Sequence, residues 1–369
     1  MRVDRLTLKD FTVFAEADFE FSPGLNFLIG ANGTGKSHVL KVLYSILRPL
    51  ASIRPGGGTG EPPFDKDSGF GWDKMFAVLR PEPAARSELG KGAFHSLTRH
   101  GANNLHVGVN GDFGEMWLDV EGGAVPAFFY DVARPAGHAV FIPASEVLSI
   151  YPGFVSAYER RELSFDETFR DLCVDLSATP LRSVSPPLLA EIAEKLDAAV
   201  GGKTVLRGDR FYVSLAEDWL LEAPMLAEGL RKLAAIAHLI RNGSIAEKGS
   251  LFWDEPETNM NPKLIPIVAR TLMALAAAGV QVFVATHDYL LTNELSIAAE
   301  YQTADATAAK LKFFCLNRPA SREPVEVQSG ATLSDLATNP ILEEFAAHYD
   351  REQALFNREE SPAADGGSP

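Results

Sequence analysis

The sequence predicts an α/β protein with a mostly parallel sheet, an antiparallel β subdomain and an inserted helical lobe. Three observations point to this class. A short apolar run at residues 25–29 leads through a glycine-rich loop into a helical pattern. Helical and strand-like segments alternate again over residues 226–320, which is typical of a parallel sheet wrapped by helices. Between these two parts, short strand-like stretches with glycine-containing turns give way to helical periodicity.

Length and composition are those of a folded protein. The chain has 369 residues, of which 46% are hydrophobic and 22% are charged, and its length exceeds the size at which a single core stops growing. We therefore expect one large domain that carries an inserted lobe. Cys173 and Cys315 stand far apart and match no metal-ligand spacing, so neither a disulfide framework nor a zinc site is predicted.

Hydropathy and charge bear on the compartment and the partners. No apolar run approaches the ~20 residues needed to cross a bilayer, and the start, MRVDRLTLKD, lacks the apolar stretch of a secretion signal. We expect a cytoplasmic protein that does not enter a membrane. A net charge of −15 opposes broad, non-specific attraction to nucleic acid, which depends on Lys and Arg. A local basic groove for nucleic acid stays an open alternative.

The first part of the chain, residues 1–142, is predicted to form a lobe rich in β-strands. Apolar and polar residues alternate over residues 3–8 and 13–21, as in two half-buried antiparallel strands. The apolar strand at residues 25–29 precedes the glycine-rich loop, and a helix follows that ends at Pro49.

Two further segments of this lobe have weaker patterns. Residues 54–65 contain so much Gly and Pro that we expect a mobile connection without regular structure. From about residue 76 to residue 141, strand-like stretches are separated by Gly-Asp and Gly-Gly turns, which predicts a β-rich meander.

Residues 143–225 are predicted to form the inserted helical lobe. Ser164 and Glu167 match a capping box ahead of one helix, and Ser185-Pro186 precedes another. Charges of both signs are mixed over residues 158–173, which favours a solvated helical face over a groove for nucleic acid.

Residues 226–320 are predicted to complete the parallel sheet. A helix over residues 226–240 leads to the strand in SLFWDEPE, and Asn261-Pro262 begins the next helix. VQVFVATHD and LKFFCLN then supply two more strands around a further helix. Residues 321–369 form a C-terminal extension whose last residues, 361–369, are expected to be disordered.

The glycine-rich loop carries the clearest functional pattern. GANGTGKS, residues 30–37, matches G-x-x-x-x-G-K-[ST] in full, between a strand and a helix. Such a loop turns backbone N–H groups towards the β-phosphate, while Lys36 reaches the β- and γ-phosphates and Ser37 binds Mg²⁺. We therefore expect ATP and Mg²⁺ as ligands, with nucleotide contacts from Gly30, Ala31, Asn32, Gly33, Thr34, Gly35, Lys36, Ser37 and His38.

An acidic pair and a histidine follow on later strands. Asp254 comes at the carboxyl end of an apolar strand, where it is suited to hold Mg²⁺ directly or through water. Glu255 is suited to orient and deprotonate the attacking water. His287 ends the next strand, which directs its imidazole towards the γ-phosphate. The predicted catalytic residues are therefore Glu255, Lys36 and His287, and the predicted metal ligands are Ser37 and Asp254.

In their order and spacing, these residues resemble the ABC-type ATPase head shared by SMC-like and recombination-repair ATPases, and especially the compact AAA_15/AAA_21 group related to OLD-family proteins. The resemblance covers most of the chain and implies a P-loop NTPase of the ABC/SMC-head type. It implies that residues 30–37 are Walker A, that Asp254 and Glu255 are Walker B and the catalytic glutamate, and that His287 is the switch histidine. It also implies that residues 257–262 are the D-loop, which crosses a dimer interface.

The same resemblance places a signature motif at PMLAEGLRKLA, ahead of the acidic strand. In the family this helix end caps the ATP held by a second subunit, which implies a nucleotide-dependent head-to-tail dimer and a nucleotide contact from Gly229. Ala227 stands where the usual serine would be, and Arg231 or Lys232 is a candidate to compensate. An ordinary amphipathic helix is the alternative. The family's Q-loop glutamine has no clear counterpart, and Glu146 is a candidate for its place.

Three functions stay open, because a phosphate loop fixes nucleotide chemistry and leaves the output undefined. The first is a prokaryotic anti-phage defence ATPase, whose dimer opening and closing controls a separate effector protein. The second is a DNA-repair clamp or loader, against which the acidic balance argues mildly. The third, a transporter subunit, is disfavoured by the β-rich insertion and the altered signature. Too little chain follows His287 for a metal-binding nuclease domain, so we expect that the chain does not itself cut DNA.

Overall fold

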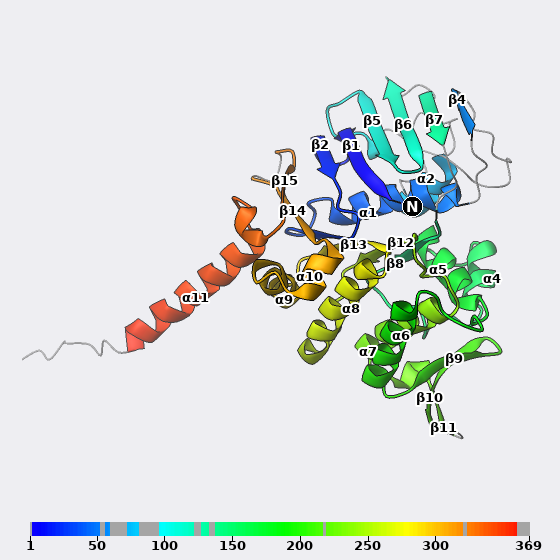
Figure 1. Cartoon of the computed structure of the whole chain (residues 1–369). Coiled ribbons are helices and arrows are strands. Elements are labelled where there is room, and N and C mark those ends of the chain that lie inside the picture. The colour runs from blue at the N-terminus through cyan, green and yellow to red at the C-terminus, as the bar shows by residue number, and fades with distance from the viewer. Residues whose placement is uncertain are drawn as a thin grey trace, which may run out of the picture.

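The computed structural model describes residues 2–51, 56–59, 72–80, 96–121, 127–132, 137–216, 219–319 and 323–359. It confirms a mostly parallel sheet combined with antiparallel sheets and helices (Figure 1). The expected disordered end, residues 361–369, lies outside the described residues, as does most of the expected connection at residues 54–65. Within that connection, Gly56–Thr59 forms strand β4. The expectation of irregular structure is wrong there, because pairing with another strand satisfies this backbone.

Six strands form the central sheet, in the spatial order β15 (Glu326–Gly330), β14 (Lys312–Asn317), β3 (Leu25–Ile29), β13 (Gln281–Thr286), β12 (Ser250–Asp254) and β8 (Ala139–Ile142). All neighbours are parallel except β15, which is antiparallel to β14. Strand β3, which precedes the glycine-rich loop, therefore lies next to β13, and β13 lies next to the acidic strand β12. The three strand ends that carry the predicted site are consecutive in the sheet.

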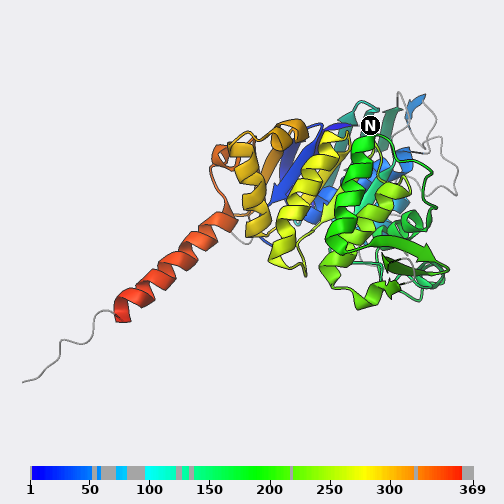
Figure 2. The same ribbon diagram turned by 60° about the horizontal axis from the view of Figure 1, so that its bottom comes forward.

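Alternate residues of the central strands face two hydrophobic cores. Leu28 of β3 and Phe283 of β13 lie in the core that contains helix α1 (Lys36–Leu50). Phe27 and Val284 lie in the core on the other face. Every residue of β3 and β13 is buried, as in parallel sheets that helices cover on both faces. The helices that contribute to the second core include α6 (Pro187–Val200), α7 (Glu228–Arg241), α8 (Ile265–Ala277), α9 (Tyr289–Glu300) and α10 (Ala304–Ala309) (Figure 2).

A second six-stranded sheet, entirely antiparallel, shares the core of α1 (Figure 1). Its strands, in spatial order, are β2 (Phe14–Glu20), β1 (Val3–Phe11), β5 (Asn104–Gly111), β6 (Gly114–Glu121), β7 (Ala127–Val132) and β4. The structure confirms the antiparallel pair at the start of the chain and the later meander. Sequence reasoning did not predict that β5 pairs with β1, which joins both parts into one sheet. Helix α2 (Trp72–Leu79) was not predicted either.

The segment from residue 143 to residue 225 contains helices α4 (Phe154–Glu159), α5 (Glu167–Ser177) and α6, together with a three-stranded sheet that was not predicted. The strands of this sheet, in spatial order, are β11 (Trp219–Glu222), β10 (Arg210–Ala216) and β9 (Lys203–Arg207). The predicted capping box at Ser164 is wrong. The N-cap of α5 is Asp166, whose carboxylate accepts a hydrogen bond from the N–H of Thr168 (2.9 Å), because a short carboxylate reaches the free N–H groups of the first turn.

The C-terminal part adds α10, β15 and α11 (Pro340–Glu359), none of which was predicted. Helix α11 extends away from the body of the molecule in both views (Figures 1 and 2). Helix α1 includes Pro49 and ends one residue later, at Leu50. Among the described helices, none is both long and apolar enough to cross a bilayer.

Candidate functional site

The loop between β3 and α1 has a backbone that requires glycine at two positions. Gly30 and Gly35 have φ angles of +153° and +90°. A Cβ atom on Gly30 would lie 2.3 Å from the carbonyl oxygen of Leu316, and one on Gly35 would lie 2.7 Å from Val13. Both distances are well below van der Waals contact, so the tight curl of the loop depends on these glycines.

Lys36, the first residue of α1, is turned back over the loop. Its Nζ donates hydrogen bonds to the carbonyl oxygens of Gly30 (2.7 Å) and Ala31 (2.8 Å). Burial lowers the pKa of Lys36, and the carboxylates of Glu255 and Asp254 act in the opposite direction. Because Asp254 ends β12 and Glu255 follows it, the lysine and the acidic pair occupy one region of the molecule.

Ser37 and Asp254 meet directly, although they are 217 positions apart. The Ser37 hydroxyl donates a hydrogen bond of 3.0 Å to Oδ1 of Asp254. Burial raises the pKa of Asp254, and the hydrogen bond from Ser37 opposes this shift. A hydroxyl and a carboxylate fit Mg²⁺, which usually takes one or two protein ligands and fills its shell with phosphate and water oxygens. Among the described residues, no group of three or more His, Cys, Asp or Glu side chains could hold a metal.

Glu255 and His287 also come together. Nδ1 of His287 lies 3.1 Å from Oε1 of Glu255, and Oε2 of Glu255 accepts a hydrogen bond from the Thr258 hydroxyl (3.2 Å). Glu255 has a φ angle of +46°, and its N–H donates to the carbonyl of Ala285 (2.8 Å). The carboxylate is thus held between an imidazole and a hydroxyl on a strained backbone. Such a carboxylate is suited to orient a water molecule.

Glu257 belongs to this region and was assigned no role of its own from the sequence. Its exposed fraction is 9%. Oε1 accepts a hydrogen bond from the Thr286 hydroxyl (2.5 Å), and Oε2 is buried without a hydrogen-bond partner among the described residues. Burial raises the pKa of Glu257. The Thr286 hydroxyl also accepts from the N–H of Asp288 (2.9 Å), so the contact fixes the loop after β12 to the end of β13.

The N-terminus of α7 carries the predicted signature motif, and the structure buries part of it within the chain. The N-cap, Ala227, makes no side-chain capping hydrogen bond. Gly229 packs against the loop after β12, since a Cβ atom there would lie 3.0 Å from Met260 and 3.1 Å from Leu264. The small size of Gly229 is therefore needed inside the molecule. Its contact with a partner's nucleotide stays a prediction.

Arg231 and Lys232 are both held inside the chain. Nε of Arg231 lies 2.9 Å from Oε1 of Glu146, with side-chain exposures of 14% and 6%. Nζ of Lys232 donates a hydrogen bond of 2.7 Å to the carbonyl of Thr258. The hypothesis that either residue replaces the missing serine towards a partner is therefore not supported. Glu146 also accepts a hydrogen bond from the N–H of Ser149 (3.2 Å), and its Q-loop role stays a prediction.

A cavity beside the phosphate loop was not predicted from the sequence. Its volume is about 590 Å³. His38, in the first turn of α1, lies at this side of the loop: its Nδ1 is 3.1 Å from the Thr12 hydroxyl, and burial lowers its pKa. No local pattern could have indicated the cavity, because its lining comes from distant segments. The lining includes Thr12, Val13, Arg99, His100, Arg318 and Glu323.

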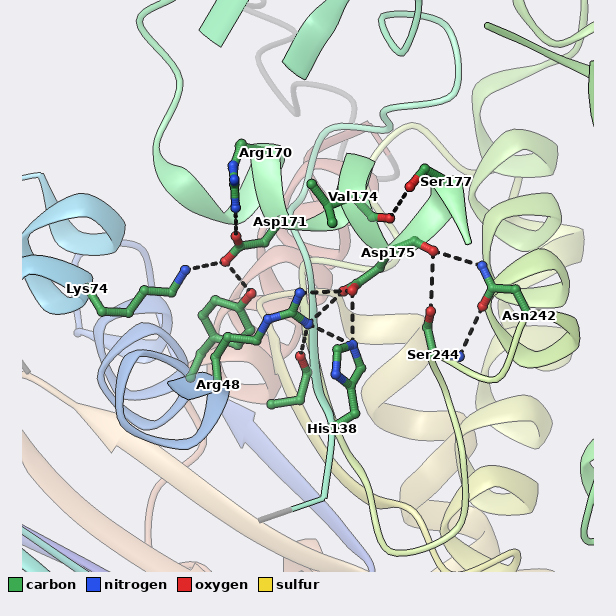
Figure 3. Close-up of polar contacts among 12 residues, drawn as sticks. Arg48, Lys74, His138, Arg170, Asp171, Val174, Asp175, Ser177, Asn242 and Ser244 are labelled. Atoms are coloured by element: carbon green, nitrogen blue, oxygen red, sulfur yellow. Dashed lines mark hydrogen bonds and ion pairs between the residues drawn. The ribbon is translucent and has the colours of Figure 1, made fainter. Parts of the chain in front are cut away.

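A buried polar network ties the helix after the phosphate loop to the inserted lobe (Figure 3). Three side chains on successive turns of α1 contact three aspartates at the start of α5 and along it. Nε2 of His138 lies 2.9 Å from Asp175, and Lys74 of α2 pairs with Asp171. The contacts between α1 and α5 are Lys41 with Asp166 (2.7 Å), Tyr44 with Asp171 (2.7 Å) and Arg48 with Asp175 (2.8 Å).

Comparisons with known proteins bear on both lobes. Residues 156–293 match the family AAA_21, described as "AAA domain, putative AbiEii toxin, Type IV TA system", and residues 5–47 match another AAA-domain family, AAA_23. The DNA replication and repair protein RecF of Salmonella typhi and that of Salmonella paratyphi B are each 47% identical to this chain over 58 residues. That segment is 15% of this chain and 16% of each relative, so the match spans about a sixth of their length.

The solved structures extend the likeness to the whole fold. An SMC head bound to the C-winged helix domain of ScpA is similar over 89% of this chain and 98% of that chain. The TM-score is 0.53 and the sequence identity is 14%, which shows a shared fold.

Proposed function

The chain has the fold of an SMC/ABC-like ATPase head, and we propose that it binds ATP with Mg²⁺ and hydrolyses it between the ends of β3, β12 and β13. One observation carries the proposal. Ser37 meets Asp254, and Glu255 meets His287, at consecutive strand ends beside the phosphate loop. These are the groups that phosphoryl transfer needs: a lysine, a metal-binding pair, a base and a second polar group near the transferred phosphate.

Each residue has its own part in the proposed reaction. The loop N–H groups and the N-terminus of α1 attract the β-phosphate. Lys36 exchanges its bonds to the loop carbonyls for bonds to phosphate oxygens. Ser37 and Asp254 would hold Mg²⁺, which would supply positive charge against the phosphates. Glu255 accepts a proton from the attacking water, and His287 stabilises charge on the transferred phosphate.

The cavity beside the loop supports a nucleoside triphosphate over a simple polyphosphate. A ligand whose phosphates lie in the loop has its base and ribose on one side, and the cavity offers about 590 Å³ there. The side chains of Arg318, His100 and Glu323 supply donors and acceptors for the nucleoside. We assign the base and ribose to this cavity.

For the biological output, we propose a nucleotide-dependent head-to-tail homodimer in the cytoplasm that controls a separate effector protein in prokaryotic anti-phage defence. The match of residues 156–293 to a family whose description includes a toxin–antitoxin system supports this output. A DNA-repair or recombination ATPase is the second candidate. The likeness of a 58-residue segment to RecF favours it, and the net charge of −15 disfavours an extended DNA surface.

Phosphate release from ATP by the purified chain, with Mg²⁺ and with EDTA, tests the catalytic proposal. Lys36→Ala should lose both ATP binding and phosphate release, because it removes the ammonium that lies over the loop carbonyls of Gly30 and Ala31. Lys263→Ala, which changes an exposed lysine, should match the unchanged chain. Wild-type release no greater than that of Lys36→Ala would refute hydrolysis.

Two measurements separate the proposed outputs. In Glu255→Gln, ATP should double the mass in size-exclusion chromatography with light scattering, because unhydrolysed ATP joins the two heads. A mass that does not respond to ATP contradicts the dimer. DNA mobility that changes only with ATP favours the repair function, and no DNA binding with or without ATP favours the defence function.

A further inference from the structure

A buried lysine from α7 lies under the loop that carries Glu255. Lys232 has an exposed fraction of 2%. Its Nζ donates a hydrogen bond of 2.7 Å to the carbonyl of Thr258 and lies 3.5 Å from the carbonyl of Glu255. Among the described residues, no carboxylate forms an ion pair with it, although Glu228 and Glu257 lie near enough to favour its charge. Burying an ammonium without an ion-pair partner is unfavourable. A lysine is therefore expected at this position only if its hydrogen bonds have a function.

One of the two carbonyls that Lys232 contacts belongs to Glu255 itself, and the other belongs to Thr258, whose hydroxyl contacts the Glu255 carboxylate. The Thr258 hydroxyl donates to Oε2 of Glu255 (3.2 Å), and the Thr258 N–H donates to the Glu255 carbonyl (3.2 Å). Glu255 has a φ angle of +46°, which costs about 1–3 kcal/mol in a residue other than glycine and persists only where the surroundings enforce it. An ammonium that is hydrogen-bonded to the Thr258 carbonyl and lies close to the Glu255 carbonyl is such a restraint.

The same loop is packed against the start of α7 at two further points. Nδ2 of Asn259 donates a hydrogen bond of 3.0 Å to Oε2 of Glu228, and Gly229 packs against Met260. Helix α7 and the loop after β12 therefore form one packed unit, with the charge of Lys232 buried between them.

We propose that Lys232 is a positioning residue for ATP hydrolysis: it restrains the loop from Glu255 to Thr258, so that the Glu255 carboxylate stays where it can activate water. The inference rests on the proposed function, in which Glu255 is the base. The sequence made Lys232 a candidate for contact with a partner subunit, whereas here it supports the catalytic residue of its own chain. Burial also lowers the pKa of Lys232. The proposal depends on the contacts of its Nζ with the two carbonyls.

Lys232→Met tests the proposal, because methionine fills similar space and donates no hydrogen bond. The turnover number should fall about 10- to 100-fold, as expected when a catalytic group is displaced by about an ångström. The KM for ATP should stay unchanged, since the phosphate loop is intact. The melting temperature should not fall, because the cost of burying the ammonium disappears. Lys263→Met, at an exposed lysine of the same region, is the matched control and should change nothing.

Two further variants separate positioning from general packing. Thr258→Val removes the hydroxyl that contacts Glu255 and keeps the carbonyl that contacts Lys232. In the double variant, the fold-loss of turnover should be smaller than the product of the two single fold-losses, because both substitutions act through Glu255. Lys232→Arg keeps a cationic donor and should recover part of the turnover lost in Lys232→Met.

The outcomes distinguish this inference from the proposed function. Wild-type turnover in Lys232→Met overturns the inference, and so does a loss of turnover that follows a lowered melting temperature. If Glu255→Gln is inactive while Lys232→Met is fully active, the inference alone fails. If Glu255→Gln hydrolyses ATP as fast as the wild type, the proposed function fails whatever Lys232 does.

Discussion

Nδ1 of His287 lies 3.1 Å from Oε1 of Glu255, although the two residues are 32 positions apart. They follow the ends of β13 and β12, which pair in parallel with Asp254 opposite Ala285. Parallel neighbours end at the same edge of a sheet, and such edges are where open α/β sheets bind ligands. The contact therefore results from sheet order and not from nearness along the chain.

His287→Ala should lower the turnover number for ATP about 10- to 100-fold and leave the KM nearly unchanged. The imidazole contacts the predicted base, while the phosphate loop and Lys36 are unchanged in this variant, so binding should persist. Steady-state phosphate release at several ATP concentrations checks this. His348→Ala, on exposed α11, is the control. A raised KM with an unchanged turnover number contradicts the assignment.

Gly35→Ala should destabilise the phosphate loop and weaken ATP binding. Gly35 has a φ angle of +90°, and an added Cβ would lie 2.7–2.8 Å from Val13 and Phe14. Left-handed strain and crowding together should cost about 1–3 kcal/mol. Gly33→Ala is a matched control, since Gly33 also has a positive φ but open space at Cβ. Calorimetric titration with ATP should show a larger loss for Gly35→Ala, and equal losses would exclude crowding as the cause.

Asp171 should stabilise the fold in a pH-dependent way. Burial acts to raise the pKa of Asp171, but Lys74 and Arg48 outweigh it, so the pKa is lowered. The folded-state pKa is thus below the unfolded value of about 3.9. The stabilisation is fully present above that value and is lost as the pH falls through the lowered pKa.

Asp171→Asn should therefore cost about 3 kcal/mol of unfolding free energy at pH 7, because it breaks one of the two ion pairs of the buried Lys74, the other being with Glu167. The difference from the wild type should shrink below about pH 4. Urea unfolding at both pH values measures it. Asp18→Asn, in an exposed ion pair with Arg5, should have little effect. A difference for Asp171→Asn that is independent of pH would show that charge is not the cause.

Arg318→Ala should weaken ATP binding about tenfold, the worth of one hydrogen bond to a charged group. Nε of Arg318 is buried at the cavity without a hydrogen-bond partner among the described residues. Tripolyphosphate lacks a nucleoside, so its affinity should not change. Competition of both ligands against a fluorescent nucleotide gives the ratio. Equal weakening of the two ligands would place Arg318 at the phosphates instead of the nucleoside.

The parts of the site that the sequence predicted are those in which a local pattern decides the geometry. The loop from Gly30 to Ser37 follows a buried strand and opens a helix, so its place at a strand end was readable from the chain. Asp254 and His287 each follow an apolar run of strand length, and the alternation of helices and strands predicted a parallel sheet. Strand order then brought the ends together.

The parts that the sequence did not predict depend on which groups become buried. Glu257 and Glu255 stand in the same acidic stretch of the sequence. The packing of the loop on β13 buries Glu257 and leaves Glu255 partly exposed. Lys232 and Arg231 look alike as basic residues of a helix, yet both turn into the chain because α7 lies against the loop after β12. The cavity lining and the pairing of β5 with β1 likewise join segments far apart in the sequence.

Single-turnover hydrolysis of bound ATP tests the central claim, that one triphosphate is bound and cleaved where these strand ends meet. Wild-type chain and Glu255→Gln would be loaded with radiolabelled ATP and Mg²⁺, and the bound ADP followed over time. We predict equal initial loading, cleavage in the wild type, and retention of intact ATP in Glu255→Gln. Cleavage at the same rate in both chains would contradict the account, because the carboxylate beside His287 would then not be the base.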